Sequence, residues 1–263
     1  MTIALRITAD MRFTLLAIAS IAWSLTVLRW SISRRQSPWG KRAIAVSAIA
    51  AIIAIVSIAS DLRSVWLRSH APRSNLMITI NDMGEWWQLV YRRGGASFVT
   101  ANELHVPVGA VVSVTWSGAF RSREPALVID RQGRHQLTAV AIWPPRLRHL
   151  ATIADDTAEF DRWFVREATP AVNRSGAPLF TNAGCSLCHV IRGVVAEPSM
   201  IAPDLTHFAS RRTIAAIDLP NEHGYLSGWI VNSRALKHGS EMPENNVDAA
   251  VLHQLVSYLE SLR

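Results

Sequence analysis

The sequence has very few cysteines, and this limits the cofactors that it could bind. Its 263 residues include only two, Cys185 and Cys188. Two thiols exclude a disulfide scaffold, a four-cysteine zinc site and an iron–sulfur cluster held by the chain's own thiolates. Disordered and low-complexity classes are excluded as well, because 49% of the residues are hydrophobic and only 18% are charged. The length is sufficient for two or three domains.

Acidic residues are scarce at the start of the chain. Residues 1–72 hold nine Lys and Arg against two Asp and Glu, residues 73–172 hold 11 against 10, and residues 173–263 hold seven against eight. The net charge of +7 therefore comes from the first segment, and the remainder offers no basic face for a phosphate backbone. We expect no nucleic-acid partner.

The first segment contains two runs without a charged residue, 13–28 and 43–60. Both approach the length of a membrane-spanning helix, and tryptophans lie near their ends. We therefore expect a multidomain membrane protein in the lipid bilayer, with a two-helix transmembrane hairpin over residues 1–72 and spans at about 13–30 and 43–60. A cleaved signal peptide or a pair of buried core helices fits these runs less well.

The loop between the two runs is rich in Arg and Lys, and such short loops stay on the cytoplasmic side. We therefore expect a multi-pass protein of the bacterial cytoplasmic (inner) membrane. Its soluble domains, residues 73–172 and 173–263, would lie on the periplasmic side.

Residues 73–172 contain short runs of strand-forming residues that turn residues separate. The runs lie at 77–81, 111–116, 126–129 and 136–142. Short strands with regular turn signals are typical of an antiparallel sandwich or barrel.

Three segments of this region carry a family resemblance. Residues 84–87 read GEWW and are similar to a Gly-x-Gln-Trp-aromatic strand. Residues 100–109 read TANELHVPVG and match an A-N-E-L-x-x-P-V-G strand and turn. Residues 159–163 read EFDRW and are similar to an E-F-x-x-W segment. With the expected hairpin, they resemble subunit II of the haem-copper terminal oxidases (cytochrome c oxidase subunit II). The resemblance implies a cupredoxin-like β-sandwich over residues 73–172.

The copper site of that family has no counterpart here. The family uses a Cys-x-Glu-x-Cys-x3-His-x2-Met loop and an upstream histidine, whereas both cysteines of this chain lie far downstream. A copper centre that transfers electrons needs thiolate ligation, so no copper A is expected. The scattered histidines His105, His135 and His149 are more typical of surface or structural positions.

Two tryptophans in the 84–87 segment call for different interpretations. Trp86 aligns with the tryptophan that lies between the copper and the next haem in the family, so the resemblance makes it a possible electron path. A packing role fits Trp86 equally well. For Trp87 we favour packing in the sandwich.

The segment Cys185-Ser186-Leu187-Cys188-His189 has the C-x-x-C-H spacing of covalent haem attachment. Two thiols at this spacing reach the two vinyl groups of one haem, and the adjacent histidine lies under the iron as proximal ligand. A redox dithiol would need a βαβ context, and a zinc site would need further ligands. We therefore expect an all-α class I cytochrome c domain over residues 173–263 with one covalent haem c.

A methionine is expected as the sixth iron ligand, because His/Met ligation raises the haem potential. Only Met200 and Met242 follow the haem motif. Residues 237–243 resemble the K-x-G-x-x-M-P ligand loop of cytochrome c domains fused to caa3-type oxidase subunit II, which favours Met242. His207 and His238 are weaker alternatives.

Other residues are assigned by resemblance to small c-type cytochromes. The carbonyl of Pro203 would orient the proximal histidine. Arg211, Arg212 and Trp229 are candidates for contacts to the haem propionates, although solvated arginines are an equally simple interpretation. Residues 247–262 show helical periodicity, which predicts a closing helix that packs on the core.

Together these features predict an electron-entry subunit of a membrane haem-copper oxidoreductase. It would take electrons from a cytochrome c or an upstream respiratory complex, and pass them through its haem to the haems of catalytic subunit I without a copper A relay. Other membrane subunits are expected partners, and no bond-making residue is expected on this chain. The alternatives are a subunit of a nitric oxide reductase of the same superfamily and a membrane-tethered cytochrome c carrier.

Overall fold

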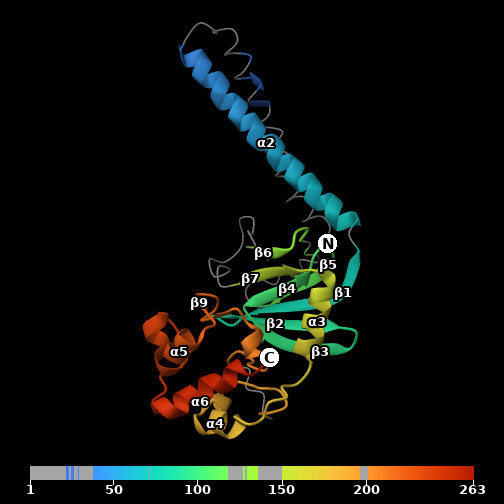
Figure 1. Cartoon of the computed structure of the whole chain (residues 1–263). Coiled ribbons are helices and arrows are strands. Elements are labelled where there is room, and N and C mark those ends of the chain that lie inside the picture. The colour runs from blue at the N-terminus through green and yellow to red at the C-terminus, as the bar shows by residue number, and fades with distance from the viewer. Residues whose placement is uncertain are drawn as a thin grey trace. The chain divides into compact units, whose positions relative to one another are not determined.

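The computed structural model describes residues 22, 23, 25, 26, 29, 38–70, 72–117, 127, 129–135, 150–195 and 201–263. The chain divides into two compact units, residues 1–70 and 71–263. The main described element of the first unit is one helix of 33 residues, α2 (Pro38–His70) (Figure 1).

The expected transmembrane hairpin is not found in the part of the chain that the structure describes. Among the residues that the structure describes, no helix is long and apolar enough to cross a membrane. Most of the first expected span, 13–30, lies outside the described residues. The second, 43–60, lies within α2, which is described but is not among helices that could cross a membrane. The expectation of two spans is therefore wrong for the described part of the chain.

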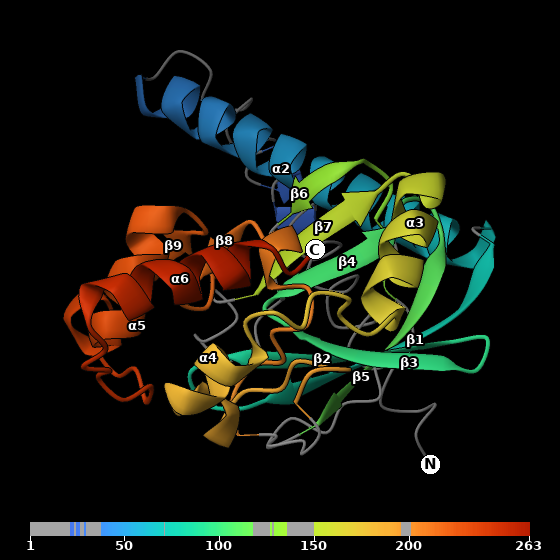
Figure 2. The ribbon, with the colours of Figure 1, turned by 60° about the horizontal axis from the view of Figure 1, so that its bottom comes forward.

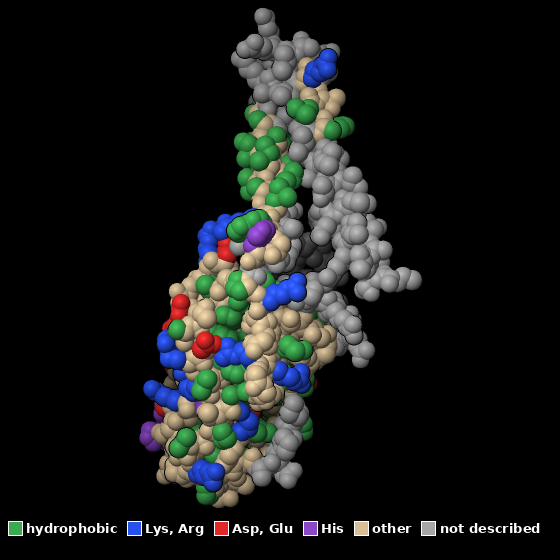
Figure 3. All heavy atoms as spheres, turned by 90° about the vertical axis from the view of Figure 1, so that its right-hand side faces the viewer, with side chains coloured by type: hydrophobic (Ala, Val, Ile, Leu, Met, Phe, Trp, Pro, Cys, Tyr) green, Lys and Arg blue, Asp and Glu red, His purple; other side chains and the backbone are tan. Residues whose placement is uncertain are grey.

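Large apolar side chains of α2 are exposed along the helix (Figure 3). They belong to Val46, Ile49, Ile52, Ile53, Ile55, Val56, Leu62 and Trp66.

The second unit begins with a β domain of two sheets. The four-stranded sheet has the order β3 (Ala96–Ala101), β2 (Trp87–Arg93), β1 (Arg73–Asp82) and β5 (Val111–Ser117). The three-stranded sheet has the order β4 (Glu103–Pro107), β7 (Ala151–Asp155) and β6 (Gly133–His135). Helix α3 (Thr157–Ala168) follows β7 and packs against β3 and β4.

The strand expectations are confirmed at β1 and β5, which contain 77–81 and 111–116. Leu127 of the run 126–129 forms an isolated bridge to Val112, and the run 136–142 lies outside the described residues. The purely antiparallel arrangement is wrong, because β1 runs parallel to β5 and β4 runs parallel to β7. The chain changes sheet between β3 and β4 and returns for β5, and this crossover allows parallel pairs.

The core of the β domain lies between the two sheets and α3. It combines aliphatic residues of β1 with aromatic residues of β2 and α3, such as Ile78, Tyr91, Phe160 and Trp163. The residues 159–163 therefore pack α3 onto the sheets: Tyr91 lies edge-on to Trp163, with ring centroids 5.1 Å apart.

The C-terminal segment is mainly helical. Its helices are α4 (Ala177–Asn182), α5 (His223–Leu236) and α6 (Ala249–Glu260), which lie together in Figure 2. Between them are two short 3-10 turns, Cys185–Leu187 and Phe208–Ser210, and a hairpin of β8 (Thr213–Ile214) and β9 (Leu219–Pro220). The hairpin is a small departure from an all-α domain. The expected closing helix is present as α6, which buries Leu255 and Leu259 in the core of this segment.

Candidate haem site

The C-x-x-C-H segment forms a tight turn directly after α4. Gly184 has a φ of 77°, in the left-handed region that favours glycine, and this residue ends the helix. The backbone N–H groups of Cys188 and His189 then both donate to the Cys185 carbonyl, at 3.2 and 2.9 Å. The two cysteines and the histidine are therefore held within one turn of chain.

Both cysteines are free thiols and are partly buried. Burial raises the pKa of the Cys185 thiol to about 11, and the neighbouring Cys188 contributes in the same direction. A thiol with this pKa stays protonated near neutral pH, unlike the low-pKa thiolate of a redox dithiol. In addition, the described residues contain no group of three or more His, Cys, Asp or Glu side chains that could hold a metal ion.

His189 has the orientation of a proximal iron ligand. Its Nδ1 atom lies 2.8 Å from the Pro203 carbonyl oxygen, which can only accept, so Nδ1 carries the proton. Burial lowers the pKa of His189 against the opposing effect of this hydrogen bond, which favours the neutral ring. Nε2 then keeps its lone pair for a metal. The structure thus brings Pro203 to His189 as expected.

Met242 lies in a loop that two serines hold against α5. The hydroxyl of Ser233 donates to the Met242 carbonyl at 2.9 Å, and the hydroxyl of Ser240 donates to Ser233 at 2.8 Å. The Met242 side chain is partly buried against the core cluster of this segment, and so is Trp229. The other candidate, Met200, lies outside the described residues.

These residues fit a covalently bound haem. Cys185 and Cys188 would hold it through thioether bonds, and the free Nε2 of His189 would ligate the iron. Met242 remains the predicted sixth ligand. The weaker candidate His207 instead donates from Nε2 to the Thr169 carbonyl at 2.9 Å, and His238 is exposed. The haem would supply a one-electron redox centre, while the chain orients it and keeps water from it.

Arg211 does not extend into solvent. It is partly buried, and its Nη2 atom donates to the Asp204 carbonyl. Burial lowers the pKa of its guanidinium, whereas the nearby charges of Asp204, Glu167 and Glu103 act in the opposite direction. Arg212 is exposed, and its backbone N–H lies 3.0 Å from a Glu103 carboxylate oxygen.

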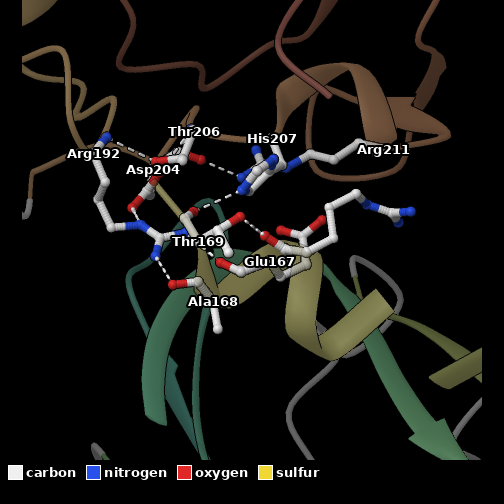
Figure 4. A network of polar contacts seen from close by, with 9 residues as sticks. Glu167, Ala168, Thr169, Arg192, Asp204, Thr206, His207 and Arg211 are labelled. Carbon is white, nitrogen blue, oxygen red and sulfur yellow. Dashed lines mark hydrogen bonds and ion pairs between the residues drawn. The ribbon is translucent and has the colours of Figure 1, made fainter. Parts of the chain in front are cut away.

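A polar network joins the end of α3 to the haem-binding segment (Figure 4). Arg192 donates to the Glu167 and Ala168 carbonyls at 2.5 and 3.4 Å, and its Nε atom lies 3.3 Å from the Asp204 carboxylate. The network explains why the β domain and the C-terminal segment form one compact unit. Sequence reasoning missed it, although Asp204 directly follows Pro203.

Trp86 lies in the turn between β1 and β2 and is partly buried. The preceding residue, Glu85, is close to the loop that carries Met242: a Cβ atom added to Gly239 would lie 3.5 Å from a Glu85 carboxylate oxygen. Trp87 is 3% exposed and packs edge-on to Trp116, which agrees with the packing role favoured for it.

His105 serves the fold of the β domain. Its Nδ1 atom lies 2.6 Å from the Asp155 carboxylate, and its ring stacks on Trp163 with centroids 4.3 Å apart. His149 lies outside the described residues.

A scan against protein-family models matches residues 174–263 to the family described as Cytochrome c. The match covers about a third of the chain, and a search of curated proteins finds no match. The matched region contains the C-x-x-C-H turn, the His189–Pro203 hydrogen bond and the Met242 loop. Residues 174–263 are therefore a cytochrome c domain, which carries a covalently bound haem c and suits electron transfer.

Proposed function

We propose that this chain is an electron-entry subunit of a membrane haem-copper oxidoreductase. Its cytochrome c domain would accept one electron at a time from a cytochrome c or an upstream respiratory complex. The chain would then deliver the electron to the haems of a catalytic partner subunit, without a copper A relay. Because haem is attached to C-x-x-C-H segments outside the cytoplasm, these domains would act on the outer side of the bacterial cytoplasmic membrane.

The observation that carries this proposal is the attachment of the cytochrome domain to the β domain. Glu103, in the segment that resembles oxidase subunit II, accepts hydrogen bonds from the backbone N–H groups of Arg212 and Thr213 in the cytochrome domain. A fixed orientation suits a subunit that must hold its haem near a partner's haem. It suits a shuttle on a loose tether less well.

The turn that carries Trp86 adds a second argument. It lies beside the Met242 loop, because Glu85 is close to Gly239, and so offers a route for an electron from the cytochrome domain to the β domain. Trp86 is the aromatic residue that we assign to this route.

The test is a reduced-minus-oxidised visible spectrum of the tagged, full-length protein purified from its native cells in mild detergent. We expect bands of haem c together with bands of a- or b-type haem from the co-purified catalytic subunit. Haem c alone, in a preparation whose chain is intact, would contradict the subunit proposal and favour an independent carrier.

A nitric oxide reductase subunit is the second candidate. The observation that favours it is the use of both cysteines in the C-x-x-C-H turn, which leaves no thiolate for a copper relay. The same purified complex separates the two, since an oxygen reductase consumes oxygen and a nitric oxide reductase releases nitrous oxide.

A further inference from the structure

Arg211 lies next to the segment that orients the haem ligand. Its guanidinium donates to the carbonyl of Asp204, and the preceding carbonyl, that of Pro203, accepts the hydrogen bond from His189. A change in the charge around Arg211 therefore affects the proximal side of the haem.

Two carboxylates of the β domain bind the residues on either side of Arg211 in the chain. Glu167 accepts a hydrogen bond from the Ser210 hydroxyl at 2.8 Å, on one side of Arg211. Glu103 accepts from the backbone N–H groups of Arg212 and Thr213 at 3.0 and 2.8 Å, on the other side, and from the Thr213 hydroxyl at 2.6 Å. Only 5% of Glu103 and 4% of Glu167 are exposed.

Buried charges of this kind act over longer distances than exposed ones, because water screens them weakly. Oxidised haem carries one more positive charge than reduced haem. A buried carboxylate nearby stabilises the oxidised form and lowers the potential, whereas a buried guanidinium does the opposite.

We propose that Glu103 of the β domain lowers the reduction potential of the haem c, acting through Arg211 and the Pro203–Asp204 segment. Glu103 is a positioning residue that contacts neither the haem nor its ligands. The β domain is then an electrostatic part of the haem site as well as a support for it. The proposal rests on the bound haem c, and is independent of the oxidase role.

The test is the variant Glu103→Gln in the full-length holoprotein, with a potentiometric titration of the haem bands. Glutamine keeps the size of the side chain and an oxygen that accepts the backbone hydrogen bonds, but removes the charge. We expect the reduction potential to rise by at least about 28 mV, which for one electron corresponds to a threefold change in the redox equilibrium constant. A potential that is unchanged or lower overturns the proposal.

The control is Glu260→Gln in the cytochrome domain. Glu260 is a carboxylate whose side chain is 41% exposed and which pairs with His223, so we expect its removal to leave the potential unchanged. A rise of the same size in this variant would show a general effect of net charge and would also overturn the proposal.

Two variants of Arg211 distinguish an electrostatic change in the potential from a change caused by a loosened structure. We expect Arg211→Gln to lower the potential and Arg211→Lys, which keeps the charge, to remain near the wild type. A structural opening would admit water, stabilise the oxidised haem and lower the potential in the Glu103 and Arg211 variants alike. If Glu103→Gln does not fold with haem, the two Arg211 variants make the test: a potential that Arg211→Gln does not lower, or that Arg211→Lys lowers equally, overturns the proposal.

Discussion

Met242 is held in place by its own carbonyl, which accepts a hydrogen bond from Ser233, a fully buried residue. This contact positions the side chain of the predicted sixth ligand independently of any iron–sulfur bond. We expect Met242→His to retain haem c but to lower its reduction potential, because a methionine ligand raises the potential relative to a nitrogen ligand. Redox titration and the loss of the sulfur-to-iron charge-transfer band would measure the change.

The matched variant for Met242 is Met200→Leu, which alters the other downstream methionine. We expect its haem spectrum and potential to equal those of the wild type. Loss of the sulfur band in Met200→Leu, with the band intact in Met242→His, would assign the ligand to Met200 instead.

The buried phenol of Tyr91 forms hydrogen bonds to both backbone groups of a single residue, His105. Its hydroxyl accepts from the His105 N–H at 2.8 Å and donates to the His105 carbonyl at 3.0 Å. Burial raises the pKa of Tyr91 well above its usual value of 10, so the folded protein keeps the phenol protonated where the unfolded chain ionises it. Its contribution to stability is present below about pH 10 and is lost as the pH rises further.

We therefore expect Tyr91→Phe to lower the free energy of unfolding by about 1–3 kcal/mol at pH 7, because the His105 backbone groups lose their partner. The loss should shrink at pH 11. Denaturant unfolding at both pH values measures it, and Tyr225→Phe, at a position that is 44% exposed, is the control. An equal loss at both pH values would contradict the role of the buried phenol.

Among the elements, α4 and α6 meet with almost no space between them. A Cβ atom placed on Gly176, just before α4, would lie 2.1 Å from the ring of Tyr258 in α6. We expect Gly176→Ala to destabilise the cytochrome domain by about 1–3 kcal/mol, because the ring or the helix must move. Thermal unfolding followed by haem absorbance measures the change.

Gly224 provides the control for this contact. It lies in the first turn of α5, and an added Cβ would meet nothing within 4 Å. Alanine favours a helix over glycine, so Gly224→Ala should be neutral or slightly stabilising. If both alanine variants lose the same stability, the close approach of α4 and α6 is not what makes Gly176 necessary.

How well each element could be predicted from the sequence depends on how local its signals are. The C-x-x-C-H turn and α6 rest on spacings within a few residues, and both are present. Strands β1 and β5 were also recognisable from their composition. Their parallel pairing was not recognisable, because it joins Met77 to Ser113 and three strands lie between them in the chain. Two of these strands, β2 and β3, belong to the same sheet, and β4 belongs to the other.

The contacts between domains had no local signal at all. Glu103 reaches Thr213 across 110 positions, and its charge alone gave no indication of a buried partner. The apolar runs of the first 72 residues gave a strong local signal, but it led to a wrong prediction: their composition predicted a transmembrane hairpin that the described residues do not form. Apolar composition alone does not show what an apolar helix packs against.

In the molecule as a whole, the cytochrome and β domains are joined by more than the connection between α3 and α4. Glu103 and Glu167 contact residues 210–213, and Arg192 contacts the end of α3. These contacts are partly or fully buried, so salt should weaken them less than surface ion pairs. Such an interface holds the cytochrome domain in a fixed orientation on the β domain.

Arg192 is the residue whose loss should release the cytochrome domain. Its guanidinium bonds two carbonyls at the C-terminal end of α3, where a cation also compensates the helix dipole. Charged hydrogen bonds contribute about 1.5–3 kcal/mol, so Arg192→Ala should raise the opening equilibrium between the domains about tenfold or more. Limited trypsin digestion measures this as faster cleavage after Arg174, in the connection to α4, identified by the mass of the haem-containing fragment. The control is Arg166→Ala, at an exposed position in the last turn of α3, which trypsin should cleave after Arg174 at the wild-type rate. Equal cleavage rates in the two variants would mean that Arg192 does not hold the domains together.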